Sequence, residues 1–246
     1  MELYLRILNE LRGPCSDAGF DLIQPLAVGA YNDSVDGPLR LEDFGASAHL
    51  VVVIGNTRAL WPRFCDALRR DQALAAMEHP LEAYTEGCIS RAVEAIGVPA
   101  SLRWSHDVGE RLIAIQRLAH VAGLAYLSES HLSVHPKYGP WIALRAAVSF
   151  RAQGPACPAR ALRHPCGGCA HRCLPACERA LAEVHGRLTQ DGARQNWLSW
   201  LACRDACPTG REHRYGEGQI RYHYLNDSEQ LRRECLDREN GSERYS

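Results

Sequence analysis

Cysteine is the residue type whose number and spacing stand out first in this chain. Of its 11 cysteines, six fall in two short motifs in the C-terminal third. The first motif has the spacing C-x2-C-x3-C-x3-C and the second is C-x3-C-P. Thiolates are soft ligands that suit zinc and iron–sulfur clusters. The candidate metal ligands are Cys166, Cys169, Cys173, Cys177, Cys203 and Cys207.

The spacing of these cysteines resembles that of ferredoxins without matching it. The C-x3-C-P ending is how the bacterial run C-x2-C-x2-C-x3-C-P closes, and the first motif here is one residue longer in its middle gap. We expect one metal centre, an iron–sulfur cluster, with zinc as the alternative. Six thiols exceed the four that one cubane or one zinc takes, so two are spare or form a redox pair. Free thiols or a redox disulfide are the remaining interpretation.

A second set of candidate residues lies in one turn between two expected strands. Residues 135–141 read His-Pro-Lys-Tyr-Gly-Pro-Trp. The prolines and the glycine predict a turn, and its rings suit a flat, conjugated ligand. The candidate binding residues here are His135, Pro136, Tyr138, Gly139 and Trp141.

Three further positions carry charge or a titratable ring. Arg145 lies inside an apolar strand, where a charge is costly unless paired, so it indicates either a bound anion or a buried ion pair. Arg204 and Tyr215 belong to charged segments that, taken alone, are also typical of a polar surface. His120 stands near the end of an expected helix before Gly123, a position typical of a cap or core histidine as well as of a ligand.

The hydrophobic pattern predicts the elements that position these residues. Helices are expected at 3–12 (ending at Gly13-Pro14), 57–68, 80–97, 109–122, 175–188, 193–202 and 227–238. Strands are expected at 20–31 (broken by Pro25), 48–54, 101–105, 130–135 and 142–150. Residues 151–177 read as a loop-rich, cysteine-rich insertion. Because helices and strands do not alternate strictly, the class is α+β or α/β.

Composition narrows the classes of protein further. The 246 residues are 46% hydrophobic and 23% charged, as in a globular chain, and the net charge is −1, which argues against a general nucleic-acid binder. No apolar run is long enough to span a bilayer, and we read no secretory signal at the start. We therefore expect a cytoplasmic protein. Its predicted parts are a core at 1–150, a cysteine-rich insertion at 151–210 and a charged helical cap at 211–246.

Several short motifs, taken in order, resemble one family. They are AHVAGLAY at 119–126, HPKYGPWIALR at 135–145, RDA at 204–206 and RYGEGQIRY at 214–222. The family is that of the cytosolic cobalamin-processing proteins, whose human defect causes combined methylmalonic aciduria and homocystinuria of type C. The resemblance implies an α+β fold similar to flavin nitroreductases, with an antiparallel sheet, flanking helices and a C-terminal cap.

The resemblance also implies an activity. Members bind cobalamin base-off and remove its upper axial ligand, by reductive decyanation or by transfer of an alkyl group to glutathione thiolate. His120 then matches the histidine beside the corrin, and Arg145 and Arg204 match arginines that hold the glutathione carboxylates. Arg232 or Arg233 is a weaker match to a third. The turn at 135–141 and Tyr215 complete the expected cobalamin site, and glutathione or reduced flavin is the expected donor.

The cysteine-rich insertion departs from this family. It is similar to that of epoxyqueuosine reductases and corrinoid reductive dehalogenases, although the full two-cluster set is absent. A cluster that feeds electrons to cobalt is then an alternative to glutathione. Two other functions stay open: a non-catalytic corrinoid carrier, and a corrinoid-dependent reductase of a modified nucleoside or an organohalide. The expected partners are cobalamin, an electron or thiol donor and downstream cobalamin-dependent enzymes, and the expected state is a monomer or a homodimer.

Overall fold

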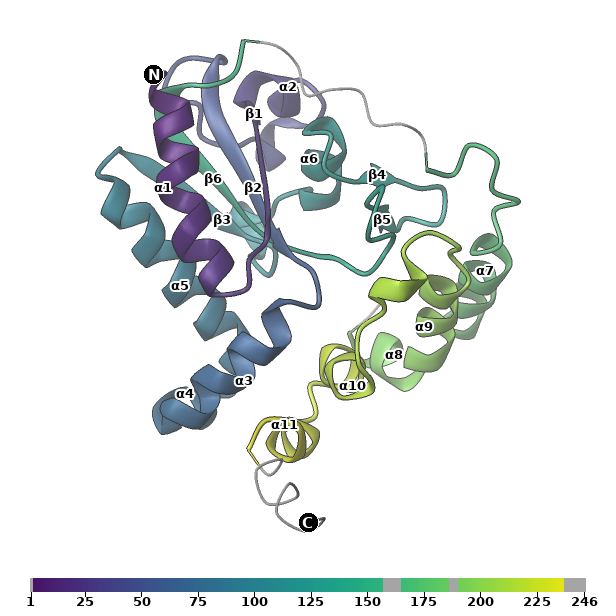
Figure 1. The fold of residues 1–246 in the computed structure, drawn as a ribbon. Helices are drawn as coiled ribbons and strands as arrows, with labels where there is room; N and C mark the ends of the chain where they lie inside the picture. Colours follow the sequence, from purple (N-terminus) through teal and green to yellow (C-terminus); the bar gives the residue numbers. More distant parts are fainter. Residues whose placement is uncertain (1, 157–164, 186–189, 237–246) are drawn as a thin grey trace.

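A four-stranded antiparallel sheet forms the centre of the molecule (Figure 1). The computed structural model describes residues 2–156, 165–185 and 190–236. The strand order is β1-β2-β6-β3, and every pair is antiparallel. This confirms the α+β class. The strands are β1 (Leu22–Ala27), β2 (His49–Asn56), β6 (Ala143–Gln153) and β3 (Ala100–Trp104).

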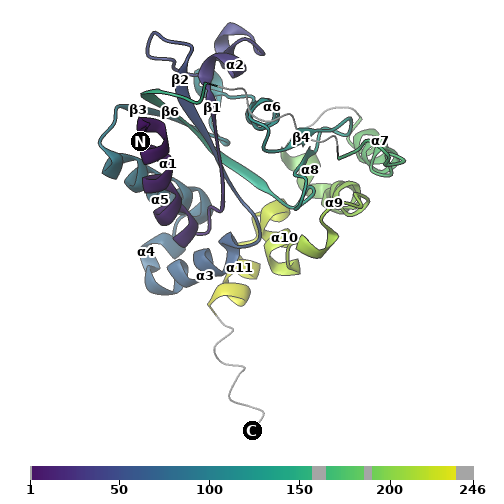
Figure 2. The same ribbon diagram turned by 45° about the horizontal axis from the view of Figure 1, so that its top comes forward.

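Helices cover both faces of this sheet, which is why β2 is a continuous apolar run. Every residue of β2 after His49 is buried. Because side chains alternate along a strand, Leu50 and Val52 pack on one face and Val51 and Val53 on the other. Figure 2 shows the first face under α1 (Leu3–Asp17), α3 (Leu60–Arg70) and α5 (Pro80–Ile96) and the second under α2 (Val28–Asn32) and α6 (Ile115–Val121).

The C-terminal part of the chain is helical. A short ladder of β4 (Tyr126–Leu127) and β5 (Ser133–Val134) leads from the sheet toward these helices. Figure 1 shows α7, α8 and α9 grouped beyond this ladder, away from α1 and α5. The helices are α7 (Leu174–Glu183), α8 (Gln190–Gln195), α9 (Trp197–Asp205), α10 (Glu217–Leu225) and α11 (Ser228–Cys235), besides the short α4 (Gln72–Ala75). No helix among the described residues is long and apolar enough to cross a bilayer.

Several element boundaries differ from the sequence prediction. The first helix runs through Pro14 to Asp17, because Leu11 and Cys15 are both buried in the core and hold the extra turn there. Residues 20–31 form β1 followed by α2, and 193–202 is divided between α8 and α9. Helix α10 was not predicted at all.

The expected helix at 109–122 is also divided. A short 3-10 turn (Gly109–Arg111) precedes α6, which begins at Ile115. Tertiary hydrogen bonds account for the break. Arg111 donates to the carbonyl of Leu102 on the edge strand β3 at 2.8 Å, and the backbone N–H of Ala114 donates to the Tyr31 hydroxyl at 3.1 Å. These contacts hold residues 111–114 outside the helix.

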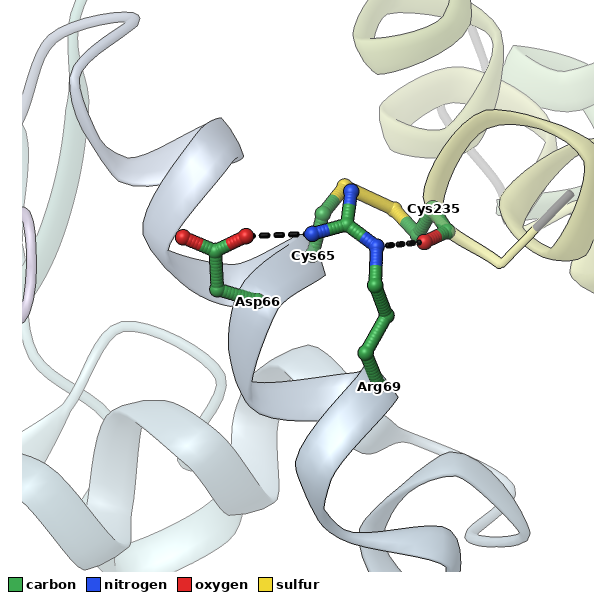
Figure 3. Close-up of a disulfide and its surroundings, with 4 residues drawn as sticks. All are labelled: Cys65, Asp66, Arg69 and Cys235. Carbon is green, nitrogen blue, oxygen red and sulfur yellow. Dashed lines mark hydrogen bonds and ion pairs between the residues drawn. A yellow bond between two sulfur atoms is a disulfide. The ribbon is translucent and has the colours of Figure 1, made fainter. Parts of the chain in front are cut away.

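A disulfide ties the last helix to the core (Figure 3). Cys65 on α3 is bonded to Cys235 on α11, across 170 positions of sequence. Arg69 donates to the Cys235 carbonyl at 2.6 Å, which satisfies an oxygen at the end of α11. This pairing was not predicted, because single cysteines far apart carry no pairing signal. The division of the chain into a core, an insertion and a cap, with boundaries at residues 150 and 210, stays a prediction.

Candidate functional site

A cavity of about 610 Å³ lies between the α6 side of the core and the C-terminal helices. Its volume is within the range of small-molecule and cofactor pockets. Helix α6 contributes Ile115, and the strand β6 region contributes Ile142 and Leu144. Helices α7 and α9 close the opposite wall with Leu181 and Trp200. The wall is mostly apolar, so a ligand here is desolvated over much of its surface.

Two polar atoms of the cavity wall are buried without a hydrogen-bond partner. They are Oγ of Ser133, on β5, and Nε1 of Trp200, on α9. An unpaired buried polar group costs about 1–3 kcal/mol. Both residues line the same cavity, but the two polar atoms themselves are covered, so a ligand pairs with them and removes that cost only after the wall side chains shift.

Arg204 reaches the same cavity from α9 and is held by aromatic rings. Its guanidinium lies 4.8 Å from the centre of the Trp141 ring and 5.4 Å from that of Tyr215. It also donates to the backbone carbonyls of Pro140 and Ile142. Trp141 and Tyr215 are buried, with ring centres 5.7 Å apart. Three predicted site residues therefore come together here, with the two rings supporting the arginine.

Arg145 opens onto a second, more polar cavity of about 640 Å³. Its Nε donates to Oδ1 of the buried Asn56 at 2.7 Å, and its Nη2 has no partner. Burial lowers the pKa of Arg145. Its hydrogen-bond partner is a neutral amide, and no ion pair of Arg145 is found among the described residues, so the anion-binding interpretation stays a prediction. His106 and Arg194 line the same cavity.

His223 and Tyr215 are neighbouring rings, with centres 5.7 Å apart, and both arginines influence their pKa values. Burial lowers the pKa of His223 well below its ordinary value, and the charges of Arg145 and Arg204 lower it further. Burial raises the pKa of Tyr215 to about 12 against the opposing effect of both arginines. Arg145 and Arg204 thus influence the pKa values of the same two rings, although they line different cavities. The sequence analysis did not identify His223 as a site residue. Its only signal in the sequence is its position among the aromatic residues of 215–224.

The predicted turn at 135–141 exists, but it packs on another part of the chain. His135 and Gly139 exchange backbone hydrogen bonds of 2.9 Å. Nδ1 of His135 accepts from the N–H groups of Lys137 and Tyr138, and burial lowers the pKa of His135 to about 4. Gly139 has φ +57°, and a Cβ there would lie 1.9 Å from the Thr209 carbonyl oxygen. Residues 135, 136, 138 and 139 lie outside the lining of the 610 Å³ cavity.

His120 occupies the last turn of α6. Its Nδ1 accepts from the Leu127 N–H at 3.1 Å, and its ring centre is 5.3 Å from that of Tyr126. Gly123, with φ +72°, follows the end of the helix as predicted. The same helix carries Ile115 into the cavity wall, while His120 itself lies outside that wall.

The six clustered cysteines gather around the α7–α9 pair. Cys203 donates to the Cys173 carbonyl at 3.5 Å, and Cys177 donates to the Ser130 carbonyl at 3.7 Å. Burial raises the pKa of Cys166 to about 11, with Glu129 and Cys207 adding to the shift. In the ranges that the structure describes, no three His, Cys, Asp or Glu side chains are arranged to hold a metal ion. The metal centre stays a prediction.

The fold is an α+β fold of the flavin nitroreductase kind: an antiparallel sheet flanked by helices. The solved structure of the B12-trafficking protein CblC of C. elegans, a homologue of human MMACHC, has this fold, with a TM-score of 0.70 and 17% identity over 96% of this chain and 97% of that chain. Epoxyqueuosine reductase from Bacillus subtilis is similar over 87% of this chain and 68% of that chain, with a TM-score of 0.51 and 14% identity. No known family model and no curated protein sequence matches the chain. The resemblance seen in the motifs is confirmed at the level of the fold.

Proposed function

We propose that this protein binds a corrinoid, cobalamin, with part of its macrocycle in the 610 Å³ cavity and the rest outside it, and removes its upper axial ligand. The observation that carries the proposal is the apolar cavity with two unpaired polar atoms, Ser133 Oγ and Trp200 Nε1. A corrin is a broad macrocycle with an edge of amide side chains, and amide oxygens accept hydrogen bonds. The fold shared with a B12-trafficking protein supports the same assignment.

The residues present fit such a substrate. Ile142 and Leu144 give an apolar surface for the macrocycle, and the Trp200 N–H and the Ser133 hydroxyl orient its edge. Arg204 places a positive charge at the cavity wall, where it stabilises an anionic leaving group. Cobalamin, when bound, supplies the cobalt that carries the upper ligand. His120 and the turn at 135–141 remain proposed members of the wider site.

An anionic thiol such as glutathione is the proposed co-substrate, and Arg145 is its proposed contact. The unpartnered Nη2 of Arg145 provides a charge-assisted donor for a carboxylate. Arg194 lines the same cavity and adds a second positive charge. Reduced flavin is the other donor class. No step of this proposal uses the predicted iron–sulfur cluster or zinc.

The test is loss of the upper ligand under anaerobic conditions. The whole protein is incubated separately with cyanocobalamin and methylcobalamin, with glutathione or with reduced flavin. Released cyanide, or S-methylglutathione, is measured together with the cobalt spectrum. Ligand release that needs the protein supports the proposal. Binding without any ligand release would overturn the enzyme assignment and support the corrinoid carrier.

A further inference from the structure

Two of the six clustered cysteines differ from the others in facing the 610 Å³ cavity. Cys177, on α7, and Cys203, on α9, both line it. They are nearly inaccessible to solvent, with exposed fractions of 6% and 2%. Cys166, Cys169, Cys173 and Cys207 lie outside its lining. The cluster therefore divides into a pair that faces the cavity and four that do not.

The two thiols of the pair are neighbours on helices that pack together. Helices α7 and α9 are in extensive contact, as Figure 1 shows. The Cys177 thiol donates to the Ser130 carbonyl at 3.7 Å and the Cys203 thiol to the Cys173 carbonyl at 3.5 Å. The Cys203 thiol interacts directly with that of Cys177. The two thiols therefore lie side by side at the wall of the cavity and away from bulk solvent.

We propose that Cys177 and Cys203 are a redox dithiol that reduces the substrate bound in this cavity. The inference rests on the proposed corrinoid function and names the reductant within it. The two thiols form one S–S bond and release two electrons and two protons. With cyanocobalamin as substrate, cobalt(III) takes both electrons and becomes cobalt(I), and the Co–C bond breaks with its electron pair on cyanide. Cyanide takes one proton, and the other goes to solvent.

The cavity sets this pair apart from the other cysteines of the described chain. Cys65 and Cys235 are already bonded to each other. Cys15 and Cys88 belong to α1 and α5, which pack against the opposite face of the sheet. A second turnover requires a thiol reductant from solution to reopen the Cys177–Cys203 bond by thiol–disulfide exchange. The pair then supplies the electrons inside the cavity, and the thiol in solution serves only to reduce the pair again.

The experiment is a single turnover without added reductant. The whole protein is reduced with dithiothreitol, freed of it by gel filtration without oxygen, and mixed with one equivalent of cyanocobalamin. Free thiols are counted, and disulfides are mapped by mass spectrometry of unreduced peptides. We expect a loss of two thiols per cobalamin reduced and a Cys177–Cys203 cross-link. The variants Cys177→Ser and Cys203→Ser should bind cobalamin and show neither, whereas the control Cys88→Ser should behave as the parent protein.

The outcomes separate the inference from the function on which it rests. If cobalamin binds but the thiol count stays constant, or another disulfide forms, the dithiol assignment is overturned and the proposed function stands. Iron or zinc that is present in the parent and lost in both serine variants would also overturn it, because these thiols would then be ligands. Absence of any cobalamin binding overturns both. If a serine variant fails to fold, the peptide map of the parent protein decides alone.

Discussion

At the scale of single residues, the account depends on the unpaired N–H of Trp200. Trp200→Phe keeps an aromatic ring in the cavity wall and removes the donor. A net hydrogen bond is worth about 1 kcal/mol, so we expect cobalamin affinity to fall about five- to tenfold. Trp197→Phe is the matched control, because Trp197 packs on Tyr224 and does not line the cavity. Equal dissociation constants for the two variants, from absorbance titration, would remove Trp200 from the site.

His135 gives a residue-scale prediction about pH. Its folded pKa of about 4 lies below its ordinary value of 6.5. The unfolded chain therefore binds the proton first, and the free energy of unfolding falls as the pH is lowered from about 6.5 to about 4. Urea denaturation of the parent and of His135→Gln at pH 7 and pH 5 measures this. The free energy of unfolding should fall less between pH 7 and pH 5 in the variant than in the parent. An equal fall in both would show that protonation of His135 does not cause it.

Some of the site residues were predictable from the sequence and others were not. Arg204 and Tyr215 were predicted through their motifs, and the structure brings both to Trp141. Ser133 and Trp200 were missed, because an unpaired serine or tryptophan has no sequence signature. Their role depends on β5 and α9 meeting across a cavity, which is a property of the tertiary fold.

At the scale of elements, the contact between the 135–141 turn and residues 209–210 is tested by glycine substitution. Gly139 has φ +57° and no room for a Cβ, whereas Gly97, with φ +70°, has open space around it. Gly97→Ala should cost about 1 kcal/mol from backbone conformation alone. Gly139→Ala adds overpacking, so we expect a loss of more than about 2 kcal/mol. Similar melting temperatures for both variants would show that the turn moves freely away from Thr209.

Elements with a strong local signal were predicted well. The apolar run at 48–54 became β2, and the helical pattern at 80–97 became α5, which ends at Gly97 in a left-handed conformation. Prediction failed where contacts from elsewhere decide the backbone. Pro14 stays inside α1 because its neighbours are buried, and residues 111–114 are held by β3 and Tyr31.

At the scale of the whole molecule, the Cys65–Cys235 disulfide holds the C-terminal end of the described chain on the core. Since it closes a loop of 170 positions, its loss should lower the free energy of unfolding by about 2–5 kcal/mol. Cys65→Ser, compared with Cys88→Ser in guanidinium denaturation, measures this. Dithiothreitol should destabilise the parent and leave Cys65→Ser unchanged. Equal stability of the two variants would mean that α11 is held by packing alone.

The central claim is that the cavity between the core and the C-terminal helices receives part of the macrocycle of cobalamin. The most direct measurement is an anaerobic absorption titration of aquocobalamin with the whole protein. The account predicts a shift of the cobalamin bands to shorter wavelength, as the lower base leaves cobalt, saturating at one cobalamin per chain and weakened in Trp200→Phe. Cobalamin that keeps its free, base-on spectrum at saturating protein would contradict the account.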